Sequence, residues 1–200
     1  MEKLPTPIES LDLASTPGPQ PLQARPPAER PIVLVGLMGV GKSTVGRRLA
    51  RRLALPFVDS DSAIEDAAGG ASAAEVFELY GELEFREGER RLVARLVEGE
   101  RKVIATGGGA FIDATTRVLL KEQAVTVWLD APVEILAERT GRQDTRPLLR
   151  DGDRTETLAR LDRERRPYYA QADIHVHSAD GSHGDVVEAI VAALDDWLAQ

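Results

Sequence analysis

The sequence predicts an α/β fold with one folded domain, whose core is a parallel β-sheet covered by helices on both faces. From Pro31 onward, short continuous apolar runs alternate with segments of helical periodicity. Continuous rather than alternating apolar strands are typical of parallel sheets buried on both sides. A chain of 200 residues with a hydrophobic fraction of 42% is long enough to bury one such core.

Five strands and five helices can be given approximate bounds. The expected strands are Ile32–Val35, Pro56–Asp59, Val103–Thr106, Val125–Asp130 and Asp173–His177. The expected helices are Lys42–Leu53, a segment from near Asp61 to Gly69-Gly70, a segment opened by the capping box Ser72–Glu75, Glu82–Glu98 and Asp185–Ala199. Residues 1–30 hold seven of the twelve prolines and no sustained hydrophobic period, so we expect a disordered tail there and the folded domain over residues 31–200.

The composition narrows the function classes. A net charge of −8 and a pI near 5.0 argue against nucleic-acid binding as the main activity. The absence of cysteine excludes disulfides and thiolate metal sites and fits a reducing compartment. The apolar runs are too short to span a bilayer. We therefore expect a cytoplasmic protein without a nucleic-acid or membrane partner. A monomer is also expected, although composition does not indicate the oligomeric state.

A glycine-rich loop, GLMGVGKST, occupies residues 36–44 between the first expected strand and its helix. The pattern G-x-x-x-x-G-K-[ST] in that context is the P-loop, in which inward-pointing backbone N–H groups and a helix N-terminus hold phosphates. Lys42 can reach the β- and γ-phosphates, and Ser43 offers a hydroxyl to Mg²⁺. A glycine turn that matches by chance is disfavoured because strand, motif and helix coincide. We expect ATP or a related triphosphate to be bound by Gly39, Val40, Gly41, Lys42, Ser43 and Thr44.

Other parts of the chain discriminate among P-loop proteins. A GTPase would carry an N-K-x-D guanine-reading motif, and the sequence contains no asparagine. A motor ATPase would place acidic residues at the end of the strand that holds Mg²⁺, but Val103–Thr106 ends in Gly107-Gly108-Gly109. Small-molecule kinases remain, and these must hold a second ligand beside the γ-phosphate.

Candidate groups for that second ligand follow the expected strands. Asp59 and Asp61 leave the second strand at the sheet edge where ligands bind, and two residues apart on an extended segment they point the same way. One could hold Mg²⁺ through water while the other grips or deprotonates a hydroxyl; helix capping by Asp61 is the alternative. The run Gly107–Gly109 permits a close approach by a ligand, or forms a loose turn.

Several arginines are candidates for holding anions. Arg86 shares a helix face with Glu89, which could orient it or simply form a helical ion pair. The segment Glu138–Arg150 is glycine-hinged and arginine-rich, so it predicts a mobile cover over the phosphates or a solvated surface. In RERRPYYAQAD (Arg163–Asp173), arginines precede an expected Pro-Tyr-Tyr turn, and one of them could clamp a carboxylate while the tyrosines pack.

The three histidines carry no predicted role. We expect His175, His177 and His183 to be structural or exposed, because their spacing suggests no chelate.

Taken together, the motifs GLMGVGKST, FVDSD, FREGE, ATGGGA, RTGRQDTRPLL and RRPYY resemble those of the shikimate kinase family, in its order and at similar spacing. The resemblance covers about Pro31 to the C-terminus. It implies transfer of the ATP γ-phosphate to the 3-hydroxyl of shikimate, in chorismate biosynthesis, and a five-stranded parallel sheet with strand order 2-3-1-4-5.

The resemblance also implies residue roles. Lys42 and Ser43 would hold phosphate and Mg²⁺, with Asp59 near the metal through water, and Asp61 would contact shikimate hydroxyls as the candidate base. Arg86, braced by Glu89, and Arg165 would grip the substrate carboxylate beside Gly107, Gly108 and Gly109. Arg146 would contact substrate and the transferring phosphate, and Arg139 would lie against adenine. The choice of Arg165 over Arg166 depends on aligning R-x-P-x-Y.

Two other readings stay open at this stage. Another small-metabolite kinase, such as a gluconate-type enzyme, would share the P-loop but has less reason to pair Arg86 with Arg165. A nucleotide-dependent regulatory protein without catalysis is disfavoured because Lys42, Asp59 and Asp61 are intact.

Overall fold

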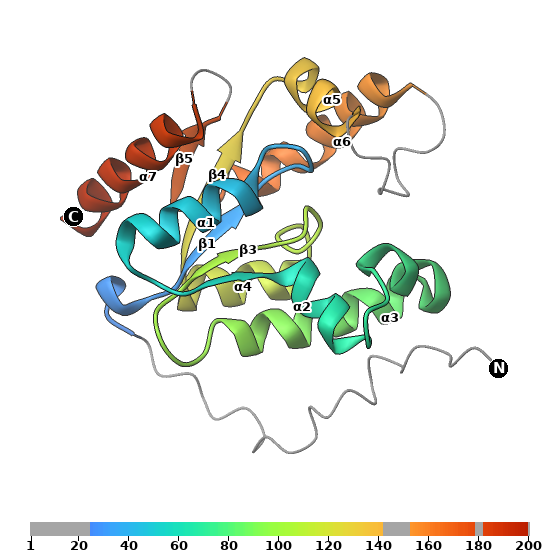
Figure 1. Ribbon diagram of the computed structural model, residues 1–200, viewed down its shortest axis with the longest axis horizontal. Helices are drawn as coiled ribbons and strands as arrows, with labels where there is room; N and C mark the ends of the chain where they lie inside the picture. Colours follow the sequence, from blue (N-terminus) through green and yellow to red (C-terminus); the bar gives the residue numbers. More distant parts are fainter. Residues whose placement is uncertain (1–24, 142–152, 179–181, 200) are drawn as a thin grey trace.

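The computed structural model describes residues 25–141, 153–178 and 182–199, and it contains a five-stranded parallel sheet (Figure 1). The strands are β1 (Ile32–Val35), β2 (Phe57–Asp59), β3 (Val103–Ala105), β4 (Val125–Asp130) and β5 (Ile174–His177). They lie in the order β2-β3-β1-β4-β5. This order confirms the predicted fold class, and every strand end lies within one residue of its expected position.

The central strand β1 fixes the position of the loop that follows it. Its four side chains are completely buried, and it pairs in parallel with β3 on one side and β4 on the other. Because all five strands run in the same direction, their carboxyl ends meet at one edge of the sheet, where ligands bind in open α/β folds. The segments that follow β1, β2, β3 and β4 therefore start side by side.

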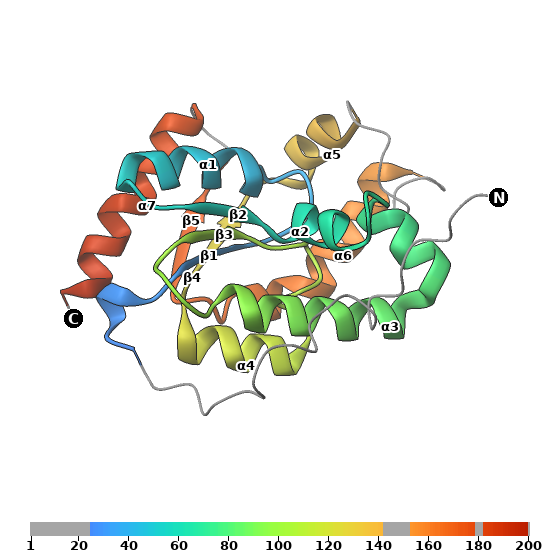
Figure 2. The same ribbon diagram turned by 60° about the horizontal axis from the view of Figure 1, so that its bottom comes forward.

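Helices cover both faces of the sheet, as Figure 2 shows. One face carries α1 (Lys42–Leu53) and α7 (His183–Leu198), which pack against each other, and the other carries α3 (Ala73–Leu96) and α4 (Ala114–Gln123). Of the remaining α-helices, α2 (Ser60–Ala67) lies between β2 and β3 in the chain. The other two, α5 (Val133–Gly141) and α6 (Arg154–Tyr169), lie between β4 and β5. The sequence patterns indicated α1, α2, α3 and α7 but gave no bounds for α4, α5 and α6.

Helix α3 consists of two pieces joined at a kink. Gly81 has φ 81° and ψ 171°, so the backbone leaves the helical region there, at the boundary expected between two helices. The first piece opens with the predicted capping box between Ser72 and Glu75. A small second hydrophobic cluster that includes Ile64, Val76 and Phe85 joins α2 to α3. These two helices thus have their own core beside the sheet.

The prediction of a Pro-Tyr-Tyr turn before β5 was wrong, because Pro167, Tyr168 and Tyr169 form the last turn of α6. A proline near the end of a helix removes only one backbone hydrogen bond, and burial can offset that loss. Tyr169 supplies the burial, since the residue is 1% exposed and its ring stacks on Trp128 with ring centroids 6.2 Å apart. Tertiary packing therefore outweighs the local signal for a turn.

Part of the expected tail contacts the domain. Pro27–Glu29 form a short 3₁₀ turn, and the Arg25 guanidinium donates to the carbonyl oxygens of Val97 and Gly99. The first 24 residues lie outside the described part of the chain. Among the helices that are described, none has the length and apolar character that crossing a membrane requires.

Candidate active site

The loop between β1 and α1 has the backbone conformation of an anion cradle. Gly39 and Gly41 have φ values of 81° and 96°, in the left-handed region that favours glycine. A Cβ atom on Gly39 would lie 2.7 Å from the Thr140 side chain. Gly41 is the N-cap residue of α1, and among the described residues no side chain forms a capping hydrogen bond at this helix start. The first N–H groups of α1 are thus free of a side-chain cap, as phosphate binding requires.

Lys42 lies inside this loop. Its ammonium group donates to the carbonyl oxygens of Gly36 and Leu37 at 2.8 and 2.9 Å, and the residue is 8% exposed. These bonds hold the positive charge over the loop rather than in solvent. Ser43 is half-buried and Thr44 is exposed on the first turn of α1. The loop therefore joins a fixed cation, a hydroxyl and a helix N-terminus.

A second group of residues borders the loop on the side of β5. Arg139, from α5, donates to the carbonyl oxygen of Ser178, and the Ser178 hydroxyl donates to the carbonyl oxygen of Val40. The other terminal nitrogen of Arg139 is buried and has no partner among the described residues. His183 lies near Gly41, and burial together with the positive charges of Arg48 and Arg139 lowers its pKa. An unpaired guanidinium nitrogen at this position suits a ligand that extends from the loop.

The three glycines after β3 are where side chains from other elements meet. A Cβ atom on Gly107 would lie 2.8 Å from an Asp61 carboxylate oxygen and 2.9 Å from a Glu89 carboxylate oxygen. A Cβ atom on Gly109 would overlap the Arg86 guanidinium. Gly107 and Gly109 therefore leave the space that these side chains occupy, while Gly108 and Gly109 lie in a turn in which the Ala110 N–H donates to the Gly107 carbonyl oxygen. The run Gly107–Gly109 thus forms a glycine floor, the stretch of backbone that Asp61, Glu89 and Arg86 approach.

Arg86 and Glu89 form a partly desolvated ion pair on the second piece of α3. The guanidinium donates to a Glu89 oxygen at 2.7 Å, and the Glu89 side chain is only 3% exposed. Burial raises the pKa of Glu89, the Arg86 charge opposes that rise, and the nearby Asp61 charge adds to it. The pair is therefore more than a surface helical bridge: the buried carboxylate fixes the guanidinium while leaving it 22% exposed at the site.

Asp59 and Asp61 lie at the end of β2 and the start of α2, which differs from the geometry inferred from the sequence. Asp59 ends β2 in extended conformation and caps α2, accepting from the backbone N–H of Asp61 at 3.1 Å. Asp61 is already helical, so the two carboxylates do not lie on one extended segment. Capping falls to Asp59, which leaves the exposed Asp61 side chain directed at Gly107.

Adjacent arginines on α6 point to different places. Arg165 donates to the carbonyl oxygen of Gly108 at 3.3 Å, which puts its guanidinium at the glycine floor. Arg166 instead forms two bonds to the carboxylate of Asp130, at 2.9 and 3.1 Å, and a further one to Asp162. Of the two, Arg165 is the one available to a ligand above the glycines.

Two residues of the site were not indicated by the sequence. The Tyr169 hydroxyl donates to the carbonyl oxygen of Gly108, and burial raises the pKa of Tyr169 to about 12, so it remains a donor at neutral pH. The Ser60 hydroxyl is fully buried and accepts from the backbone N–H of Gly107 at 3.0 Å. Both hold the glycine run from distant parts of the chain, which no local motif reveals.

Some expected groups cannot be placed, and one prediction needs correction. Arg142, Arg146 and Arg150, the centre of the predicted cover, lie outside the described residues. His175 and His177 are exposed, as expected, but the inference that their spacing suggests no chelate left out Asp130, whose carboxylate lies within 4.8 Å of a nitrogen of each ring. Residues i and i+2 of a strand share one face, so both rings reach Asp130 on the neighbouring strand.

Known proteins are similar to this chain in sequence and in fold. A family model described as shikimate kinase matches residues 38–195. The chain belongs to the shikimate kinase family. A shikimate kinase from Novosphingobium aromaticivorans is 53% identical over 173 residues, which cover 84% of this chain and 89% of that protein.

Solved structures of the shikimate kinase family share the fold. A shikimate kinase from Acinetobacter baumannii, solved in complex with shikimate, has a TM-score of 0.81 and 37% identity, covering 85% of this chain and 95% of that one. A gluconokinase from Sinorhizobium meliloti, at 18% identity and a TM-score of 0.59 over 88% of this chain and 95% of that one, shows likeness of fold alone. Family membership implies that the chain is a kinase that uses ATP.

Burial of Glu89 predicts a specific pH dependence of stability. A carboxyl group whose pKa is raised by folding binds its proton more tightly in the folded than in the unfolded protein. Its contribution to stability is therefore largest at pH values below the unfolded-state pKa, and it is lost as the pH rises through the folded-state pKa. Relative to Glu89→Gln, the wild type should therefore lose free energy of unfolding as the pH rises above about 4.5. Urea denaturation of both proteins at several pH values measures the difference.

The Arg86→Gln variant provides the matched comparison. Because the Arg86 charge opposes the rise in the Glu89 pKa, removing it should extend the loss of stability to higher pH. A difference between wild type and Glu89→Gln that stays constant with pH would contradict the assignment of a buried, destabilised carboxylate.

Proposed function

We propose that this protein transfers the γ-phosphate of ATP to the 3-hydroxyl of shikimate, giving shikimate 3-phosphate and ADP. The observation that carries the proposal is the convergence of Asp61, Arg86 and Arg165 on the glycine floor Gly107–Gly109, at the sheet edge where the phosphate loop also starts. Two guanidinium groups and a carboxylate suit a small hydroxy acid held beside a triphosphate.

The phosphate loop supplies the binding site for ATP. Backbone N–H groups from Gly39 to Thr44 and the start of α1 bind phosphate oxygens, and Lys42 places a positive charge against the β- and γ-phosphates. Arg139 would lie beside the adenine, where its unpaired nitrogen is buried. Arg146, outside the described residues, stays assigned by family resemblance to the transferring phosphate.

Mg²⁺ fits the oxygen donors at the loop. The Ser43 hydroxyl, and the Asp59 carboxylate through water, would hold the ion, since both offer the hard oxygen donors that Mg²⁺ accepts. Asp59 is the last residue of β2, at the ligand-binding edge of the sheet. When bound, Mg²⁺ would neutralise charge on the β- and γ-phosphates.

The residues around the glycine floor orient the acceptor. Arg86 and Arg165 bind the shikimate carboxylate, because a planar guanidinium matches a carboxylate with two parallel hydrogen bonds. Glu89 holds Arg86 in place from below, and Tyr169 and Ser60 hold the backbone of the glycines. The substrate is thereby fixed at its acidic end while its hydroxyls face Asp61.

Asp61 acts on the hydroxyl that reacts. The oxygen of the 3-hydroxyl attacks the γ-phosphorus in line as the bond from that phosphorus to the bridging oxygen of ADP breaks, and the hydroxyl proton passes to the Asp61 carboxylate. Lys42 stabilises the negative charge on the transferring phosphoryl group. Localisation in the cytoplasm and a monomeric state are part of the same proposal.

Coupled measurement of ADP release tests the proposal directly. With ATP and Mg²⁺, shikimate should stimulate ADP release, whereas quinate and gluconate should stimulate it far less. A larger response to gluconate would favour the gluconate-type reading, and no response to any of the acids would favour a regulatory protein without catalysis.

Replacing the candidate base separates binding from chemistry. The variant Asp61→Asn should bind ATP almost normally, because Asp61 faces the glycine floor rather than the phosphate loop, while kcat falls by on the order of 10²–10³. Equilibrium ATP binding and steady-state turnover measure the two effects. Unchanged turnover would remove Asp61 from its role.

The two neighbouring arginines of α6 provide a matched pair. Arg165→Gln should raise KM for shikimate by roughly tenfold to a hundredfold, the cost of losing a charged hydrogen bond. Arg166→Gln makes the same chemical change one residue away, should lower the melting temperature by freeing Asp130, and should leave KM within about twofold. Equal increases in KM for both variants would contradict the assignment.

A further inference from the structure

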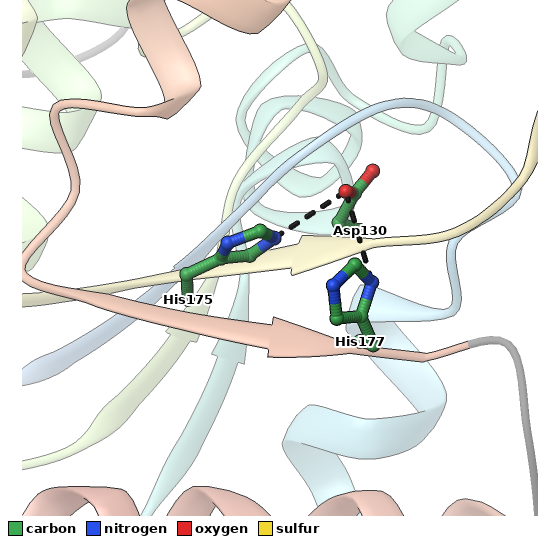
Figure 3. A group of neighbouring side chains, drawn as sticks. All are labelled: Asp130, His175 and His177. Atoms are coloured by element: carbon green, nitrogen blue, oxygen red, sulfur yellow. Dashed lines mark hydrogen bonds and ion pairs between the residues drawn. The ribbon is translucent and has the colours of Figure 1, made fainter.

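A cluster of potential metal ligands lies on the exposed edge of the sheet and takes no part in the proposed reaction. Figure 3 shows His175 and His177 on β5 with their rings directed toward Asp130 on β4. The His175 Nε2 atom is 3.3 Å and the His177 Nδ1 atom 3.9 Å from the same oxygen of Asp130. The three ligand atoms all lie within 4.8 Å of one another.

The sheet geometry brings these residues together. β5 is an edge strand whose side chains alternate between buried and exposed, so His175 and His177 share its exposed face. The parallel register pairs Asp130 with His177 and Trp128 with His175. The His175 ring stacks on the Trp128 indole at 4.0 Å between centroids and 9° between planes. One imidazole is thus held rigidly, and the 74% exposed side chain of His177 can adjust to it.

We propose that Asp130, His175 and His177 bind a divalent transition metal ion of the zinc type. Ligand atoms around tetrahedral zinc, at metal distances near 2.0–2.2 Å, lie about 3.3 Å from one another. The separation of His175 from Asp130 already has this value, and the His177 nitrogen, 3.9 Å from the same oxygen, comes into range if its exposed side chain turns toward the other two. Two imidazoles and a carboxylate leave one position for water.

Arg166 is the group that competes for Asp130, and its geometry is compatible with a metal. The guanidinium bonds both carboxylate oxygens, but an ionised carboxylate offers about four lone-pair directions. The Asp130 oxygen nearest the histidines can therefore accept a hydrogen bond from Arg166 and bind a metal ion at the same time. Asp162, which also binds Arg166, compensates part of its positive charge. Arg166 then serves to orient the carboxylate, as outer partners of metal ligands commonly do.

The ligand set distinguishes this site from the proposed Mg²⁺ site. Mg²⁺ prefers oxygen ligands, whereas imidazole nitrogens suit Zn²⁺, Ni²⁺ and Cu²⁺. The chain contains no cysteine, so no thiolate competes for such ions, and it contains three histidines in all. A bound ion would link β4 to β5 and so stabilise the edge of the sheet.

Titration of Zn²⁺ into the chain without a purification tag, in the absence of nucleotide, tests this proposal by calorimetry. The wild type should bind one ion, and His177→Gln should bind at least about tenfold more weakly because one of three protein ligands is lost. His183→Gln is the control, since it removes the one histidine outside the cluster and should bind like the wild type.

A second variant and a second measurement distinguish the loss of a metal ligand from misfolding of the variant. His175→Phe keeps an aromatic ring against Trp128 but removes the ligand nitrogen, so it should fold and should also lose Zn²⁺ binding. The wild-type melting temperature should rise with Zn²⁺ concentration but not with Mg²⁺, and the rise should vanish in both cluster variants. Binding that is equal in the wild type and His177→Gln, or that is not saturable in the wild type, would overturn the proposal.

Discussion

The proposed reaction depends on how closely side chains can approach the backbone after β3. Asp61 and Glu89 come within 3 Å of where a Cβ of Gly107 would be, and Arg86 overlaps that of Gly109. Any side chain at these positions would push the carboxylates or the guanidinium away from their common centre. The backbone of this run is in turn held by Ser60 and Tyr169. The site is therefore built around main-chain atoms, and the charged groups take their positions from them.

Electrostatics at this centre favours an acidic ligand with hydroxyl groups. Arg86 keeps one face toward the site because a buried carboxylate, Glu89, neutralises it from the other side, at an energetic cost visible in the raised pKa of Glu89. Arg165 adds a second guanidinium from α6. The exposed Asp61 faces the same floor, and an oxygen of the exposed Glu82 lies 3.7 Å from the Arg86 Nε atom. Shikimate matches this pattern of charges: its carboxylate would lie between the two guanidinium groups, and its hydroxyls would lie near the Asp61 carboxylate.

The sequence predicts some parts of this protein well because their signals are local. The phosphate loop, its flanking strand and helix, and the capping box at Ser72 are set by residues within a few positions, and the structure contains each of them. The aspartates were identified from their place after β2, although helix α2 starts earlier than expected and changes their geometry. Contacts across the fold were not predictable: Tyr169 lies 61 positions from Gly108 and Ser60 lies 47 from Gly107. The histidine pair was missed for the same reason, since its third member belongs to another strand.

Neighbouring residues on a helix are separated by about 100° of rotation, and α6 uses that angle to serve two sides of the molecule. Arg165 reaches the glycine floor, and Arg166 reaches β4. Because Tyr169 anchors the end of the helix, inserting or deleting one residue between Arg166 and Tyr169 would turn both arginine side chains away from their partners at once. The segment of α6 between Arg166 and Tyr169 should consequently tolerate exchanges of side chains far better than changes in residue number.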